Sequence, residues 1–151
     1  MSDPTGATDL VITRIFDAPR DMVYRAFVDP EQLAAWFGPV GWSVPRDTVD
    51  IDARTGGHQR FTMVSDEDPD MRSVVDGTFT EVVENELLIG EQRLDDPDIG
   101  DFVMQLRIEF HDEDGKTRMV LRQGPFDPEI ERNAHQGWNS SFTKLDALFG
   151  A

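Results

Sequence analysis

The sequence predicts an α+β domain in which a curved, seven-stranded antiparallel sheet wraps around one long C-terminal helix. Two patterns carry this prediction. Apolar residues before residue 124 recur mainly at the two-residue spacing of strands, and those after residue 129 recur at helical spacing. Gly137 and the indole of Trp138 lie in the middle of that last helix. Because a mid-helix glycine costs about 1 kcal/mol relative to alanine, we expect the helix to approach another surface there.

The N-terminal part predicts one strand followed by two short helices. Residues 10–16 are a β-branched and apolar run, as in a strand. Pro19 suits the first turn of a helix, and apolar residues follow it at helical spacing. Asp29 and Pro30 open a second short helix, which ends at the glycine- and proline-rich residues 38–41.

Six further strands are predicted before the last helix. Glycine pairs, acidic loops and a hairpin turn separate them. Apolar and polar residues alternate strictly in residues 102–110, which is typical of an antiparallel strand with one buried face. Pro125 and Pro128 are expected to end the strands. The six predicted strands are residues 43–53, 58–64, 73–83, 87–94, 102–110 and 117–123.

The last helix is predicted from residue 129, with Gly150 at its end. One of its faces is apolar and has the sheet alone to pack against. A seven-stranded sheet wrapped around one helix leaves room between them, so we expect a cavity there. The apolar face comprises Ile130, Ala134, Trp138, Ser141, Phe142, Leu145, Leu148 and Phe149.

Composition excludes several classes of function. The chain has no cysteine, which excludes disulfides, thiolate metal sites and a cysteine nucleophile. A net charge of -16 disfavours nucleic acid and anionic membranes as partners. No apolar run approaches the roughly 20 residues of a membrane span, and the first residues do not resemble a signal peptide. We expect a cytoplasmic monomer or homodimer, with one domain over residues 9–151 after a disordered tail of residues 1–8.

Residues that could carry chemistry are few. The histidines His58, His111 and His135 are not spaced as metal ligands on one element, and the acidic loop of residues 66–70 lacks the glycine and glutamate of a calcium-binding loop. We therefore expect no metal and no cofactor. Glu81 is in phase with the predicted inward face of its strand, so it is a candidate general base unless a β-bulge reverses the phase.

Several segments, taken in order, resemble the family of proteins similar to the activator of heat-shock-protein-90 ATPase. The matching segments are ITRIFDAP at residues 12–19, DPEQL and WFGP within residues 29–39, RTGG at residues 54–57, and HQGW at residues 135–138, followed by Leu145 and Leu148. The resemblance covers roughly residues 10–149. It implies the helix-grip fold of the START and birch-pollen-allergen (SRPBCC) superfamily and a pocket between sheet and helix. The cochaperone role in this family belongs to longer members with an additional N-terminal domain.

One position departs from the family pattern. Gln59 stands two positions after the glycine pair, where the family often has an aromatic residue. It is in phase with Phe61 and Met63. Either it faces the pocket, where a buried amide must find a partner, or it lies in solvent at the strand end.

The leading hypothesis is a protein that binds a small hydrophobic or amphipathic ligand between sheet and helix, with polar contacts from Gln59 and His135. One alternative is an enzyme in the same cavity, such as a cyclase, dehydratase or hydrolase, which needs at least two inward titratable groups. The other is a cochaperone-like interaction module, which predicts a closed core. The expected ligand-binding residues are Trp36, Phe37, Gln59, Phe61, Met63, Phe79, Met104, Leu106, Met119, Leu121, His135, Trp138 and Phe142.

Overall fold

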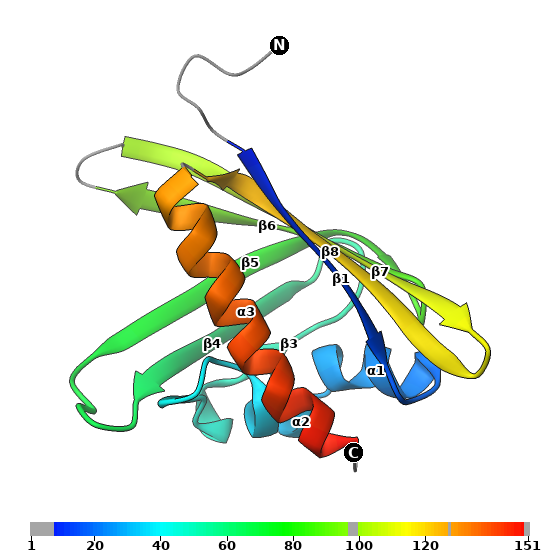
Figure 1. Ribbon diagram of the computed structural model, residues 1–151. Helices are drawn as coiled ribbons and strands as arrows, with labels where there is room; N and C mark the ends of the chain where they lie inside the picture. The colour runs from blue at the N-terminus through cyan, green and yellow to red at the C-terminus, as the bar shows by residue number, and fades with distance from the viewer. Residues whose placement is uncertain (1–7, 97–99, 127, 150–151) are drawn as a thin grey trace.

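In the computed structural model, one long helix crosses one face of an antiparallel sheet, and two short helices lie near the C-terminal end of that long helix (Figure 1). The structure describes residues 8–96, 100–126 and 128–149. The tail predicted for residues 1–8 lies almost entirely outside these residues, as does Gly150. Among the helices described, none is both long and apolar enough to cross a membrane.

The elements follow the predicted order, and the α+β class is confirmed. Within the described residues the sheet has eight strands in the order β1-β8-β7-β6-β5-β4-β2, and β3 also pairs with β4. All of these pairs are antiparallel. The elements are β1 (Thr8–Phe16), α1 (Arg20–Val28), α2 (Pro30–Trp36), β2 (Trp42–Ser43), the 3-10 helix η1 (Arg46–Thr48), β3 (Asp50–Ile51), β4 (His58–Ser65), β5 (Arg72–Val83), β6 (Leu87–Asp96), β7 (Gly100–Glu113), β8 (Lys116–Phe126) and α3 (Pro128–Leu148).

The segment predicted as one strand over residues 43–53 is interrupted. Pro45 has no backbone N–H to donate to a neighbouring strand, and it directly precedes η1. The Thr48 hydroxyl donates to the Pro45 carbonyl at 2.7 Å and closes this turn. Two short strands, β2 and β3, therefore replace one long strand, which is why the described sheet has eight strands and not seven.

The prediction that Pro125 ends its strand is also wrong. β8 continues through Pro125 to Phe126. The register between β1 and β8 shifts between Thr8 and Leu10, so the proline falls at an irregularity of the ladder. A residue without an N–H is tolerated at such a position because no partner there requires its donor.

A hydrogen bond from the side chain of Trp36 joins α2 to α1. The carbonyl of Ala26 would normally accept from the residue four positions later, but that residue is Pro30, which has no N–H. The indole Nε1–H of the fully buried Trp36 donates to this carbonyl instead, at 2.8 Å. The Asp29 side chain then caps α2 by accepting from two backbone N–H groups of its first turn.

The core fills one end of the space between α3 and the sheet. Phe142 and Leu145, in the C-terminal half of α3, are fully buried. The ring of Phe142 packs edge-on against Phe16 of β1, with centroids 5.6 Å apart. In the N-terminal half, Ala134 and Trp138 are partly buried and Ile130 is exposed. The side chains of this half of α3 therefore do not fill the space between the helix and the sheet.

Candidate ligand-binding cavity

A cavity of about 480 Å³ lies between the inner face of β4–β8, the end of α2 and the N-terminal half of α3. Strand register sets its floor, because residues paired across neighbouring strands face the same side of a sheet. One row of paired residues across the floor is Gln59, Gly77, Gln92 and Met104. The neighbouring row is Phe79, Gly90, Leu106 and Gln123.

Two glycines give the floor its depth. A Cβ atom at Gly77 would lie 3.1 Å from the backbone oxygen of Glu91, and one at Gly90 would lie 3.3 Å from that of Thr78. Both distances are tighter than ordinary contacts. Since glycine has no side chain, the cavity reaches down to the sheet backbone between the side chains of β4 and β7.

Aromatic rings form the wall opposite the sheet. The ring of Phe37, just after α2, packs edge-on against Phe61 of β4 and Trp138 of α3, with centroid distances of 4.7 and 5.5 Å. The indole N–H of Trp138 donates to Oε1 of Gln123 on β8 at 2.8 Å. These contacts hold the aromatic rings of the wall in place against β4, α3 and β8. The cavity therefore has a defined apolar surface on this side.

Gly137 lies beside this wall, but α3 does not approach another surface there as closely as the sequence predicted. The nearest atom that its Cβ would meet, outside its own neighbours in the helix, is Cγ of Pro39 at 3.8 Å, an ordinary contact. The expectation that helix packing requires a glycine here is therefore wrong. The residue borders the cavity, and a Cβ there would fit without displacing a neighbour.

The structure brings eight of the thirteen expected ligand-binding residues together around the cavity. Four of the others, Trp36, Met119, Leu121 and Phe142, are fully buried in the core behind it. The fifth, His135, sits on the flank of α3, where its Nδ1 lies 3.0 Å from Nδ2 of Asn139. The eight residues that line the cavity are Phe37, Gln59, Phe61, Met63, Phe79, Met104, Leu106 and Trp138.

Sequence reasoning missed several polar residues of the lining, among them Gln92 and Gln123. The alternation of apolar and polar residues in β6 and β8 could have identified these two glutamines. Gln92 is in phase with the buried Leu88, and Gln123 is in phase with the buried Leu121. A polar residue that continues an apolar phase is a candidate for the wall of a cavity, since it would otherwise be buried unpaired.

The cavity offers little for acid–base chemistry. Among the described residues that line it, Glu91 alone is ionisable, and this exposed residue alternates with Gln92 along β6. Glu81 is exposed because the register of β5 and β6 shifts between Phe79 and Glu81. The bulge named above as the exception is thus present, and Glu81 does not face the cavity.

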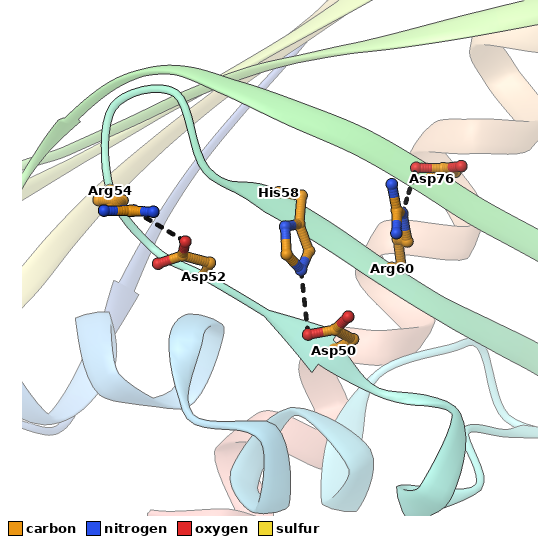
Figure 2. Close-up of polar contacts among 6 residues, drawn as sticks. All are labelled: Asp50, Asp52, Arg54, His58, Arg60 and Asp76. Carbon is orange, nitrogen blue, oxygen red and sulfur yellow. Dashed lines mark hydrogen bonds and ion pairs between the residues drawn. The ribbon is translucent and has the colours of Figure 1, made fainter.

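The outer face of β4 explains why Gln59 turns inward. Figure 2 shows its neighbour His58 facing Asp50 of β3, with Nε2 and Oδ1 3.0 Å apart, and its other neighbour Arg60 facing Asp76 of β5. The Arg60 Nε–Asp76 Oδ1 distance is 3.1 Å. The contact with His58 is the main cause that lowers the pKa of the Asp50 carboxyl. Because both neighbours are paired outside, alternation places Gln59 on the cavity side.

The described residues contain no cluster of three or more side chains able to hold a metal ion. The polar groups of the outer face are instead arranged as pairs. Besides the two pairs on β4, Arg107 Nε lies 2.9 Å from Glu109 Oε2 on β7. Such exposed pairs contribute little to stability individually, and none of their residues lines the cavity.

The chain is similar to one protein family and to several solved structures. A family model described as "Activator of Hsp90 ATPase homolog 1-like protein" matches residues 17–150. A Chromobacterium violaceum protein shares 27% identity and a TM-score of 0.82, over 93% of this chain and 95% of the other. The AHSA1 protein of Silicibacter pomeroyi shares 26% identity and a TM-score of 0.80, over 95% and 98%. A Nitrosomonas europaea protein shares 26% identity and a TM-score of 0.78, over 98% and 96%. No curated protein matches the sequence.

Proposed function

The chain belongs to the family of activator of Hsp90 ATPase homolog 1-like proteins, and on this basis we propose that it binds a small hydrophobic or amphipathic ligand between the sheet and α3. The observation that carries the proposal is the cavity of about 480 Å³. That volume falls within the roughly 300–1,000 Å³ of small-molecule sites, and apolar and aromatic side chains dominate such sites as they do here.

The lining suits ligands of varied shape. Phe37 and Trp138 supply rigid apolar surface, and Met63 and Met104 supply flexible side chains that adapt to a bound molecule. When a ligand binds, apolar surface of the ligand and of the cavity wall is removed from water. Each 100 Å² of it contributes roughly 2.5 kcal/mol to the binding free energy, at about 25 cal/mol per Å². Burial of a few such areas supports binding without any charged contact.

The two alternatives receive less support. An enzyme in this cavity needs at least two inward titratable groups, whereas Glu91 alone is titratable in the described lining, and it is exposed and alternates with the inward Gln92. A cochaperone-like module predicts a closed core, whereas the core here leaves a cavity open under α3. A binding protein accounts for both observations.

The proposal is tested by filling the cavity from its floor. Leu106→Trp places an indole in the middle of the lining, and Val103→Trp on the exposed face of the same strand is the matched control. We expect the wild type and the control to bind a fluorescent apolar dye saturably at one site, and Leu106→Trp to lose at least about tenfold in affinity. Ala134→Phe, which fills the cavity from α3, is expected to act in the same way.

Each variant is first checked for a cooperative unfolding transition, so that lost binding is not lost folding. Unchanged dye binding in both folded cavity-filling variants contradicts the proposal, as does a wild type that binds no dye. Native mass spectrometry of the protein from its own host then identifies the retained molecule by mass.

A further inference from the structure

We propose that the amides of Gln59 and Gln92 form a polar subsite that selects an uncharged amphipathic ligand, one whose polar end both donates and accepts hydrogen bonds. This inference rests on the proposed function and specifies the class of ligand. A carboxamide or an alcohol meets the description, whereas a carboxylate or an ammonium group does not.

Register places the two amides on either side of a gap. Gln59 on β4 and Gln92 on β6 both pair with Gly77 on β5, so the three residues form one row on the cavity floor. Neighbouring strands lie about 4.8 Å apart, which puts the two glutamine Cα atoms roughly 10 Å apart. Gly77 contributes no side chain between them, so both amides can reach the same ligand atoms above the glycine.

Neither amide is used by the protein itself. Both residues are half-buried, and within the described residues neither side-chain amide makes a hydrogen bond. Each primary amide offers one acceptor oxygen and two N–H donors. In contrast, Gln123 in the neighbouring row already accepts from the Trp138 indole. Amides that lose water on ligand binding must be matched by the ligand, which makes Gln59 and Gln92 determinants of specificity.

The charge of the surroundings selects against ions. The described lining contains no lysine, arginine or histidine, so a buried carboxylate would find no counter-charge. The net charge of -16 adds a field that repels anions. The same field attracts an ammonium, but Glu91, the one carboxylate of the described lining, is exposed and alternates with the inward Gln92, so it lies off the row of the two amides. A charge taken from water without a partner is strongly disfavoured, so the neutral ligand is preferred.

Four ten-carbon probes test the selection by charge: decanamide, decanol, decanoate and decylammonium, each below its aggregation concentration at neutral pH. Their affinities are measured by displacement of the apolar dye from the wild-type protein. We expect decanamide and decanol to bind at least about tenfold more tightly than either ion. Equal affinities, or a preference for an ion, would overturn the subsite, whereas dye binding alone still supports the proposed function.

The role of the two amides is tested by Gln59→Leu combined with Gln92→Leu. The control is Gln105→Leu, which removes an exposed glutamine from β7. We expect the double variant to bind the dye as the wild type does and to lose about tenfold in affinity for decanamide and decanol, with no change in the control. Should the double variant misfold, the single variants are expected to show smaller losses in the same direction. Undiminished amide binding in folded variants overturns the subsite; absence of all binding, dye included, overturns the proposed function with it.

Discussion

The indole Nε1–H of Trp138 donates to Oε1 of Gln123 at 2.8 Å, so one hydrogen bond joins α3 to β8 at the cavity wall. The same indole stacks on Phe142, with centroids 5.7 Å apart and planes 27° apart, and meets Phe37 edge-on. Its orientation is therefore set by one polar and two aromatic contacts. The cavity is held open by this arrangement, because the indole cannot turn into the space beside it without losing all three contacts.

Replacement of Trp138 by phenylalanine is expected to lower the free energy of unfolding by about 1 kcal/mol, since the hydrogen bond to Gln123 is lost. Loss of packing adds to this effect. Urea unfolding measures the change. Trp42→Phe, at a tryptophan outside the cavity lining, is the comparison and should change stability less. Equal effects of the two replacements would contradict a structural role for the Trp138 hydrogen bond.

Gly137→Ala is expected to raise the free energy of unfolding by up to about 1 kcal/mol. Alanine is the better helix former, and the new Cβ would make an ordinary 3.8 Å contact with Pro39. Thermal or urea unfolding should show a higher midpoint for the variant. A lower midpoint would mean that the helix needs a glycine at this position after all.

Thr117→Val is expected to destabilise the protein by roughly 1–3 kcal/mol. The Thr117 hydroxyl, fully buried, donates to the carbonyl of Ala18 at 2.8 Å, and valine leaves that carbonyl without a donor. The control is Thr80→Val, where the exposed hydroxyl donates to Ile89 at 3.3 Å and water can replace it. That control should stay within about 0.5 kcal/mol of the wild type. Similar costs at the two sites would refute the argument from burial.

Glu109 is expected to make stability depend on pH in acid. The hydrogen bond from Arg107, followed by that from His111, lowers the pKa of its carboxyl below the ordinary value of 4.5. Folding therefore favours the carboxylate, so this contribution is present above pH 4.5 and is lost as pH falls through the lower pKa of the folded state. Near neutral pH, Glu109→Gln should cost no more than about 1 kcal/mol, because the pair is partly exposed.

Unfolding in urea at several pH values checks this prediction. The difference in stability between wild type and Glu109→Gln should shrink steadily as the pH falls below 4.5. A difference that stays constant in acid, or grows, would show that the charge of Glu109 does not stabilise the folded state.

Local patterns in the sequence predicted the element order and the class of fold. Alternation in residues 102–110 identified β7 with its buried face, and the period after residue 129 identified α3. The helix-grip prediction and the family resemblance are confirmed by the family model and by the structural neighbours. These features could be predicted because the spacing of apolar residues is itself set by the geometry of strands and helices.

The alternation of β4 also indicated the phase of Gln59, but the set of polar groups around the cavity was decided by tertiary structure. Gln92 and Gly77 come beside Gln59 through strand register, and Glu81 turns outward through a bulge in β5. Phe142 is absent from the lining because the C-terminal half of α3 is covered by the core, and His135 is absent because it sits on the flank of α3 beside Asn139.

The sequence by itself thus determined which elements form and which face of each is apolar. Tertiary structure decided where apolar faces meet and where they stay apart, and so which of the aromatic residues are core and which line a cavity. The physical reason is that periodicity is a property of a single segment, whereas register, bulges and enclosed space depend on several segments packed together.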